Sequence, residues 1–333
     1  MIEFSDVEKM VLTRLQRGVL PVERPFKGFE LPEDSVVELL IRAKQQGILR
    51  RFGGIFDARR LGYQSVLCAY DCASELIDKK AALIAEHPGV THCYERRPLH
   101  GSEPYPPLWF TLAMLRDEFH DGIASLRAQL KPECGTLYEL PALQRFKVDV
   151  VFDLHGSGRD ELQSGINPAT LLDQDDVYLS FSTEEKQLVR AMDQHIPLVT
   201  RPFAQLAEEL GQTEQFFLET LTRWKEQGVL RRIGAILYHR KVGFSANAMC
   251  VWPIDGDVAE AGRRVAQRPE VTHCYQRPRM DGFPFDLYAM IHTQSWEQAE
   301  ALYQTISTAC ELRAGRILGS VREFKKSSMT YFR

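Results

Sequence analysis

Two short segments of the chain place an imidazole, a phenol and a guanidinium at alternate positions. Residues 92–96 read HCYER, and residues 273–277 read HCYQR. In a β-strand the side chains at i, i+2 and i+4 share one face. The side chains on that face are His92, Tyr94 and Arg96 in the first segment, and His273, Tyr275 and Arg277 in the second. Such a stripe combines a group that titrates near neutral pH, a hydrogen-bonding group and an anchor for an anion.

The cysteines of these segments, Cys93 and Cys274, fall on the opposite strand face. We expect them in a helix-covered core as small hydrophobic residues, which disfavours a nucleophilic cysteine paired with its neighbouring histidine. The chain has seven cysteines and no CxxC pair. This pattern predicts reduced thiols, with neither a disulfide scaffold nor a metal site built from cysteine.

Arginines recur at matching offsets elsewhere. GILRRFGGI and GVLRRIGAI each carry an adjacent pair, and further arginines follow the HCY segments. A planar guanidinium binds a carboxylate through two hydrogen bonds, so paired clusters suit a polyanionic ligand held between domains. The alternative is that they are solvated or pair with acidic neighbours. The arginines that we expect to bind such a ligand are Arg50, Arg51, Arg96, Arg231, Arg232, Arg277 and Arg279.

The segment after each HCY strand differs between the two copies. It reads RPLHGSEPYPPLWFTL in the first and RPRMDGFPFDLYAMIH in the second, and supplies Trp109 and His100, or Tyr288 and His292. Flat rings beside arginine and histidine suit a large planar anionic ligand, while core or interface packing is the alternative. Because His100 and His292 have no counterpart in the other half, we expect one main productive site, with the other half contributing scaffold.

Composition excludes several classes of protein. The chain has 333 residues, 41 basic and 45 acidic, with a formal charge of −4. A chain that coats nucleic acid should carry a basic excess. No apolar run approaches the roughly 20 residues that span a bilayer, and the start MIEFSDVEKM lacks a signal-peptide layout. We therefore expect a soluble cytoplasmic protein without a membrane partner.

The segments that must position these residues occur twice in the sequence, as an internal repeat. Residues 47–64 return as residues 228–245, displaced by 228 − 47 = 181, and PGVTHCYER returns as PEVTHCYQR at the same displacement. Two copies of roughly 150 residues follow, joined by a segment rich in Gly, Ser, Asp and Asn. Their docking side by side would make a covalently tied pseudo-dimer.

Each copy divides again. Helical periodicity and capping signals predict three helices, the second curtailed in the first copy, followed by two short strands around a polar tip: a winged helix-turn-helix. Then come strand, helix, strand, strand, helix, strand, with ALQRFKVDVVF as the last strand of the first copy: a ferredoxin-like βαββαβ unit. The fold class is α+β. The expected domains are winged helices at 1–62 and 178–243, ferredoxin-like units at 63–154 and 244–333, and a linker at 155–177.

The helices that would enter a DNA groove are acidic. One carries Glu214, Glu219 and Glu226 against two cations, and its counterpart carries carboxylates in its first turns. Carboxylates placed against phosphates repel, so the electrostatic contribution that supports non-specific DNA affinity is missing. We therefore expect a retained scaffold and no DNA binding.

The motifs above resemble those of a known enzyme family. Winged-helix and ferredoxin-like halves alone resemble the Lrp/AsnC transcription regulators. Halves that each carry GxLRRxGxI, VTHCYxR and LWFTL or LYAMIH resemble the siroheme decarboxylases, in the form that fuses two halves in one chain. The resemblance covers nearly the whole chain apart from the linker.

This resemblance implies a reaction. Carbon dioxide is removed from the acetates at carbons 12 and 18 of siroheme, giving 12,18-didecarboxysiroheme for haem d-one or an alternative haem pathway. It implies no separate cofactor, since the iron belongs to the substrate. Losing carbon dioxide needs an electron sink, which protonation of a pyrrole carbon would create. The expected proton donors are His92 or His100 and His273 or His292, although one histidine could instead be an axial iron ligand.

The expected partner is a small-molecule tetrapyrrole. The sequence leaves open the order of the two decarboxylations, the association of two chains and contact with neighbouring haem-pathway enzymes. Two other functional classes stay open. One is an Lrp/AsnC-like regulator that senses haem or an amino acid, and the other is a haem carrier that binds without turnover.

Overall fold

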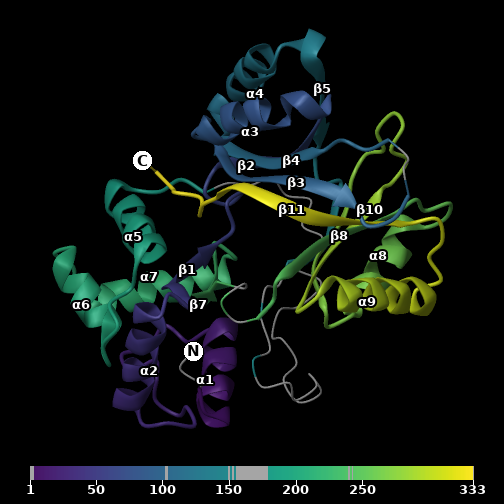
Figure 1. Ribbon diagram of the computed structural model, residues 1–333. Helices are drawn as coiled ribbons and strands as arrows, with labels where there is room; N and C mark the ends of the chain where they lie inside the picture. Colours follow the sequence, from purple (N-terminus) through teal and green to yellow (C-terminus); the bar gives the residue numbers. More distant parts are fainter. Residues whose placement is uncertain are drawn as a thin grey trace.

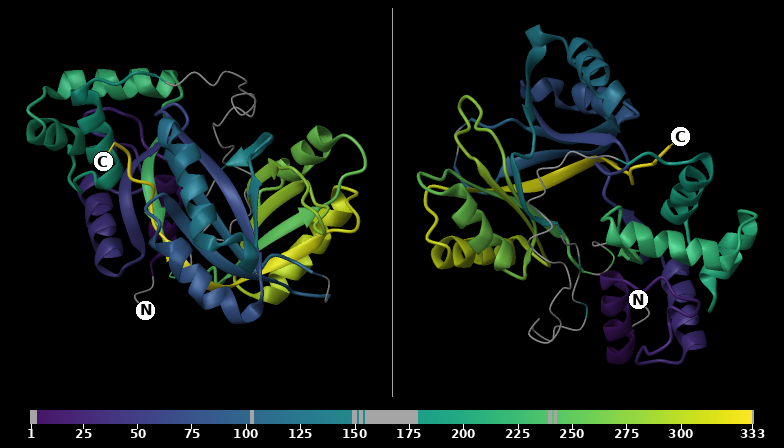
Figure 2. Two further views of the ribbon diagram at one scale, coloured as in Figure 1. Left: turned by 90° about the horizontal axis from the view of Figure 1, so that it is seen from above. Right: turned by 180° about the vertical axis from the view of Figure 1, so that it is seen from behind.

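The computed structural model describes residues 4–101, 104–148, 151, 154, 179–238, 241 and 243–332. The expected linker, residues 155–177, lies outside the described residues. Two similar halves make up the described chain, and the helices of the two winged-helix regions, purple and green in Figure 2, lie together in both views. The C-terminus lies beside them.

The winged-helix elements begin where the capping signals predict. In the first half, α1 (Asp6–Arg17) and α2 (Glu33–Gln45) precede β1 (Leu49–Phe56); in the second, α5 (Thr183–Gln194), α6 (Pro202–Glu209) and α7 (Glu214–Glu226) precede β7 (Leu230–Leu237). Ser5 and Ser182 form capping boxes at the starts of α1 and α5. Within the described part of the first half, no helix separates α1 from α2, whereas the sequence predicted a curtailed one there.

The expected wings form differently from the prediction. β1 and β7 pair with each other in an antiparallel two-stranded sheet, whereas the sequence predicted a hairpin within each half. Each strand also packs against the first helix of the other half, β1 against α5 and β7 against α1. A Cβ at Gly53 would lie 2.8 Å from the Met192 carbonyl oxygen, and one at Gly234 would lie 2.6 Å from that of Leu15. The repeated glycine of GxLRRxGxI therefore allows a helix of the other half to approach.

Each half continues with a ferredoxin-like unit (Figure 1). The first contains β2 (Tyr63–Cys72), α3 (Ile77–Glu86), β3 (Val90–Pro98), β4 (Leu108–Leu115), α4 (Arg116–Leu130) and β5 (Gly135–Leu140). The second contains β8 (Ala246–Trp252), α8 (Val258–Gln267), β9 (Val271–Gln276), β10 (Leu287–Thr293), α9 (Trp296–Ala309) and β11 (Arg316–Lys326). The strand orders β5-β2-β4-β3 and β11-β8-β10-β9 are equivalent. The βαββαβ prediction is confirmed in both halves.

The last strand of the first unit was placed too late in the sequence prediction. The strand that completes the unit is β5, which pairs with β2, and it begins at Gly135, 316 − 135 = 181 residues before β11. The segment expected to complete it forms β6 (Gln144–Val148) and pairs with β9 of the other half. β11 behaves in the same way, since its first part pairs with β8 and its second part with β3.

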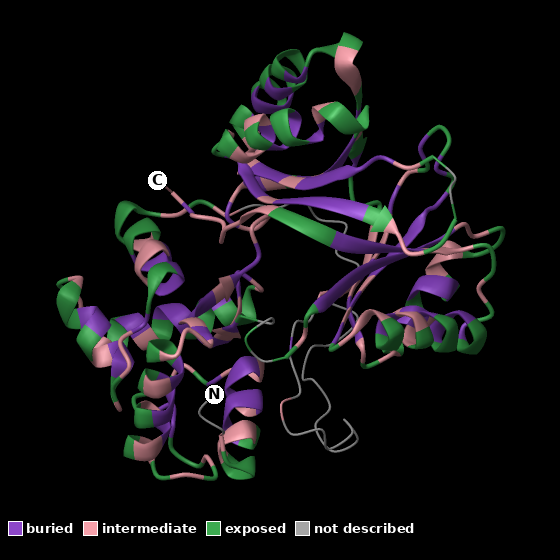
Figure 3. Ribbon diagram, in the orientation of Figure 1, coloured by how far each residue is buried: buried purple, intermediate pink, exposed green. Residues whose placement is uncertain are grey.

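These exchanged strands join the two units into one sheet. In the described residues its order is β5-β2-β4-β3-β11-β8-β10-β9-β6, so β5 and β6 stand at opposite edges. Only residues 141–143 separate them, which limits the distance between the end of β5 and the start of β6 to roughly 14 Å. The sheet therefore curls until its two edges meet. Its outer face carries α3 and α4 over one unit and α8 and α9 over the other, each with its sheet-facing side buried (Figures 1 and 3).

Candidate functional site

A cavity of about 1280 Å³ lies between the inner face of the curled sheet and the β1–β7 pair. Residues of both units, of both winged-helix strands and of the C-terminal segment after β11 line it. Drug-sized ligands occupy pockets of roughly 300–1,000 Å³, so this cavity suits a larger molecule. Twelve of the predicted site residues line it: Arg50, Arg51, His92, Tyr94, Arg96, Trp109, Arg232, His273, Tyr275, Arg277, Tyr288 and His292. Their roles remain predictions.

The HCY strands present two ladders to this cavity. We call His92, Tyr94 and Arg96 the β3 ladder, and His273, Tyr275 and Arg277 the β9 ladder. The rings of His92 and Tyr94 stack with centroids 6.2 Å apart, and those of His273 and Tyr275 with centroids 6.3 Å apart. The guanidinium of Arg96 lies 5.5 Å from the Tyr94 ring, and that of Arg277 lies 4.7 Å from the Tyr275 ring. The expected stripe is confirmed in both copies.

The neighbouring cysteines point away from the cavity. Cys93 and Cys274 are fully buried in the cores beneath the helices, and the Cys274 thiol donates to the Gly262 carbonyl oxygen in α8. Burial raises the pKa of Cys93 to about 12 and raises that of Cys274 as well. Both thiols stay protonated, as expected of small core residues.

The arginines of the two ladders are buried cations. Arg96 is 5% exposed and donates to the Leu318 carbonyl oxygen, while Arg277 is 9% exposed and donates to that of Leu140. Within the described chain neither pairs with a carboxylate. Burial lowers the pKa of Arg96 to about 10, so it keeps its charge at neutral pH. A buried cation is costly unless an anion compensates it, so both positions suit a carboxylate of a ligand.

Two aromatic residues close the inner wall between the units. Trp109 of β4 and Tyr288 of β10 are both almost fully buried, with ring centroids 6.5 Å apart. The Tyr288 hydroxyl has no hydrogen-bond partner within the described chain, and burial raises its pKa, so it remains an unused donor. Its guanidinium neighbour is Arg277, 6.0 Å from the ring. This part of the wall is therefore a packed aromatic pair that contains a buried hydroxyl without a hydrogen bond in the described chain.

The winged-helix arginines divide between the cavity and the protein interior. Arg50, Arg51 and Arg232 line the cavity, but Arg51 also forms an ion pair of 3.1 Å with Asp193 of α5. At the position of α1 that matches Asp193 stands Gln16, since α5 begins 183 − 6 = 177 residues after α1. The two arginine pairs are therefore not electrostatically equivalent.

Three predicted site residues lie outside the cavity. His100 is on an exposed loop, where its Nε2 lies 2.6 Å from Glu300 Oε1. Arg279 pairs with Asp286 at 2.9 Å, and Arg231 pairs with Asp57 at 2.7 Å. His100 and Arg279 are thus engaged with other side chains of the protein and lie outside the cavity lining.

The first histidine of the β3 ladder is neutral at neutral pH. Its burial, together with the charges of Lys326 and Arg50, lowers the pKa of His92 to about 4. Its Nδ1 lies 3.0 Å from the Thr91 hydroxyl oxygen. The Thr91 hydroxyl oxygen also lies 3.5 Å from the Thr111 carbonyl oxygen. When the hydroxyl donates to that carbonyl, the imidazole donates through Nδ1 and keeps the lone pair of Nε2. His92 is thus suited to accept a proton or to ligate iron.

The β9 ladder has a second histidine that shares a partner with the first. The Thr272 hydroxyl donates to the Met290 carbonyl oxygen at 3.1 Å, and lies 3.1 Å from His273 Nδ1 and 3.3 Å from His292 Nδ1. Both imidazoles thus share one hydroxyl, and when its single proton is donated to the Met290 carbonyl oxygen, each Nδ1 donates to Thr272. Aligning LWFTLA with LYAMIH places Ala113 where the second copy has His292. Only the β9 side therefore has this histidine pair.

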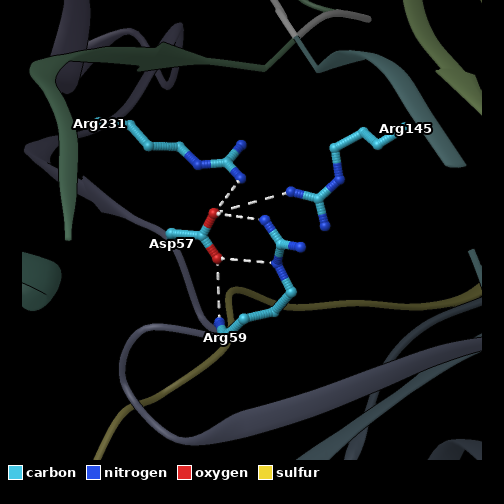
Figure 4. Close-up of polar contacts among 4 residues, drawn as sticks. All are labelled: Asp57, Arg59, Arg145 and Arg231. Carbon is cyan, nitrogen blue, oxygen red and sulfur yellow. Dashed lines mark hydrogen bonds and ion pairs between the residues drawn. The ribbon is translucent and has the colours of Figure 1, made fainter. Parts of the chain in front are cut away.

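A cluster that the sequence reasoning missed borders the β9 side. Asp57 follows β1 and contacts three arginines, Arg59, Arg145 of β6 and Arg231 of β7 (Figure 4). Arg59 and Arg145 line the cavity. Arg145 was not predicted as a site residue, because only the pairing of β6 with β9 brings it beside Tyr275. Its guanidinium lies 5.9 Å from the centre of that ring.

The cavity is cationic although the chain is acidic. Its lining contains eight arginines and one lysine against one carboxylate, that of Asp193, whereas the whole chain has a formal charge of −4. Concentrated positive charge in a half-enclosed space attracts a ligand with many negative charges. The described residues contain no group of three or more metal-ligating side chains and no helix long and apolar enough to cross a membrane.

Comparisons with known proteins define the class first. The model described as the AsnC-like ligand binding domain matches residues 60–147 and 241–325, which together are more than half of the chain. The model described as the siroheme decarboxylase NirDL-like HTH domain matches residues 185–231. The fold is thus a doubled AsnC-like ligand-binding module with attached winged helices.

Relatives then define the family. A siroheme decarboxylase of Hydrogenobacter thermophilus is 34% identical over 99% of this chain and 95% of its own length. A crystal structure of the siroheme decarboxylase NirDL, in co-complex with an iron-uroporphyrin III analogue, is 30% identical with a TM-score of 0.71, over 99% of this chain and 95% of that one. A siroheme decarboxylase beta subunit of Desulfovibrio desulfuricans, 38% identical, spans 46% of this chain and 97% of its own length. The chain belongs to the siroheme decarboxylase family.

Proposed function

We propose that this protein removes carbon dioxide from the acetates at carbons 12 and 18 of siroheme, which it binds in the cationic cavity. The observation that carries the proposal is the large cavity lined by nine cationic side chains, eight arginines and one lysine, in a chain of net negative charge. Siroheme is flat, wide and carries eight carboxylates. Such a ligand needs stacking surfaces, guanidinium groups and a large volume together.

The two ladders would share the work of holding the macrocycle. Arg96 and Arg277 are buried and lack a carboxylate partner within the described chain, so each would anchor an acetate or propionate group. Trp109 and Tyr288 would pack against the ring. Anchors on both sides would hold the reacting acetate at a fixed position relative to a histidine. Binding would then orient the acetate for the reaction.

Proton transfer would fall to the histidines. A proton delivered to the pyrrole carbon makes the ring an electron sink, so that the acetate carbon–carbon bond breaks, carbon dioxide leaves and an exocyclic methylene forms. A second proton on that methylene gives the methyl group, and the ring carbon returns its proton to a base. One proton is consumed for each carbon dioxide released. We assign proton delivery to His273 and His292, each in its protonated form, and we assign His92, whose lowered pKa keeps it neutral, as the base or the iron ligand.

The domains would divide these tasks. Residues 63–154 and 244–333 would supply the sheet with its ladders, and the winged helices, 1–62 and 178–243, would supply the opposite wall through β1 and β7. No separate cofactor enters the proposal, because the iron arrives with the substrate. Both ladders come from one chain, so the site would be complete in a monomer.

A mass-resolved turnover assay tests the function. The full chain is incubated anaerobically with siroheme, and the tetrapyrrole products are separated and weighed by mass spectrometry. We expect two successive losses of carbon dioxide that depend on intact protein. Siroheme that is bound tightly but recovered unchanged would contradict the proposal, and would favour the sensor or carrier alternatives.

A further inference from the structure

Asp57 gathers three guanidinium groups from three separate elements (Figure 4). Arg59 donates to Asp57 Oδ1 through its backbone N–H at 3.0 Å and through Nε at 3.3 Å. Arg231 Nη2 donates to Asp57 Oδ2 at 2.7 Å, and Arg145 Nη1 lies 3.8 Å from the same oxygen. The carboxylate is 8% exposed. We call these four residues the Asp57 cluster.

The Asp57 cluster holds more positive charge than its own carboxylate neutralises. Burial alone would raise the pKa of Asp57, but the guanidinium of Arg231 and hydrogen bonds from Arg59 and Arg231 bring that pKa well below its usual range. Asp57 is therefore ionised at neutral pH, and the cluster carries a charge of 3 − 1 = +2. Like charges held together in a partly buried place favour the approach of a further anion.

The excess charge faces the cavity. Arg59 and Arg145 belong to the cavity lining, whereas Asp57 and Arg231 do not. Arg145 is mostly buried, with a side chain 17% exposed, and its Nε has no hydrogen-bond partner within the described chain. Two guanidinium groups converge on one side of the cavity with donors to spare, which is the arrangement that binds a carboxylate through several hydrogen bonds.

The Asp57 cluster exists on one side of the cavity only. The position that matches Asp57 in the second half, 57 + 181 = 238, is Tyr238. Arg145 stands opposite Tyr275 in the sheet, and the residue opposite the matching Tyr94 is Glu323, so the charge is reversed there. Arg240, which matches Arg59, lies outside the described residues. The two sides of the pseudo-symmetric cavity thus differ in charge beside the ladders.

We propose that Arg59 and Arg145, held together by Asp57, form a carboxylate-binding subsite that determines which way round a tetrapyrrole lies in the cavity. The inference rests on the proposed function for the identity of the ligand. A cavity with two similar ladders would otherwise accept the macrocycle in two orientations related by the pseudo-two-fold axis. A carboxylate anchored beside the β9 ladder favours one orientation, and with it the acetate that faces His273 and His292.

Binding of a tetrapyrrole that does not react tests the subsite without turnover. The full chain is titrated with iron-free uroporphyrin III, which carries eight carboxylates, and binding is followed by fluorescence quenching. We expect Arg145→Gln to weaken binding about tenfold, as removal of a charge-assisted hydrogen bond does. Arg59→Gln, at a more exposed position, should act in the same direction if Arg145→Gln does not fold. The matched control is Arg264→Gln on α8, whose guanidinium pairs with Glu311 away from the cavity.

Two outcomes decide the inference. Unchanged affinity in folded Arg145→Gln and Arg59→Gln would overturn the subsite while leaving the decarboxylase function intact. With siroheme as substrate, wild type should release one singly decarboxylated isomer, and Arg145→Gln should release two, separable by chromatography. A single unchanged isomer in both variants would overturn the orientation role. Failure of wild type to release carbon dioxide would count against the proposed function and not against the subsite measured with uroporphyrin.

Discussion

The β3 and β9 ladders occupy matching places but have different surroundings. Across the sheet from His92 stands Lys326, whereas Val148 stands across from His273. The β9 side adds His292 and the Asp57 cluster, and the β3 side has Ala113 at the position of His292. Both ladders keep a buried arginine beneath a tyrosine. The two copies thus share the His–Tyr–Arg ladder with its buried arginine and differ in the histidine and the charged groups around it.

Substitution of the histidines should reveal the largest difference in activity between the β3 and β9 sides. We expect His292→Ala to lower kcat on the order of 10²-fold or more, because loss of a positioned acid typically costs that much. His92→Ala should slow the release of carbon dioxide less, because the proposed base accepts its proton only after carbon dioxide has left. The measurement is single-turnover release of carbon dioxide. Full turnover in the alanine variants of His92, His273 and His292 together would end the acid assignment.

The two ladder arginines should instead behave alike. Arg96→Met and Arg277→Met should each weaken uroporphyrin III binding roughly 10- to 100-fold, because each removes a buried charge-assisted partner. Each should also raise the free energy of unfolding of the unliganded protein by roughly 1–3 kcal/mol, since a buried cation without an anion is replaced by an apolar side chain. Titration and urea unfolding measure the two effects. A large effect in one variant only would break the equivalence of the anchors.

Substitution of the matching threonines, Thr91 and Thr272, should have a smaller effect on kcat than substitution of the histidines. Thr272→Val removes the shared acceptor of His273 and His292, and we expect it to lower kcat about tenfold and to displace the pH profile of kcat, as loss of a residue that orients catalytic groups does. Thr91→Val, the matching change on the β3 side, affects one histidine and should leave that profile in place. Thr272→Ser keeps the hydroxyl and should restore activity. Equal profiles in the two valine variants would contradict a positioning role of Thr272.

The pH dependence of stability should report on His92. Its folded pKa of about 4 lies below the usual value of 6.5, so the unfolded chain binds the extra proton first as the pH falls. The contribution of the neutral ring to the free energy of unfolding is complete above pH 6.5 and is lost as the pH falls from there to pH 4. At pH 5 the loss is about 2 kcal/mol. Urea unfolding at pH 7.5 and pH 5, compared with His92→Gln, measures it. The variant should lose less stability on acidification, and equal losses would contradict the burial of a neutral ring.

Local pattern was sufficient for the ladders and the repeat, but not for the pairing between halves. Alternation along a strand determines which side chains share a face, so His92, Tyr94 and Arg96 were aligned correctly. It does not determine which strand pairs with which, because backbone hydrogen bonds between strands form in the same way whatever the side chains are. The pairing of β1 with β7 and the exchange of β6 were missed for that reason, and with them Arg145. His100 was included as an unmatched histidine, although its loop turns it toward Glu300 and away from the cavity.

The exchanged strands also bear on how such a protein can be encoded. Each half lends a strand to the sheet of the other, β6 to β9 and the end of β11 to β3, and the winged-helix strands join in the same way. These contacts hold the halves together without help from the peptide chain between them. Two separate polypeptides with the same exchanges would assemble as an obligate pair. Fusion of the two genes ensures that both halves are made in equal amounts. Each half can still acquire its own substitutions.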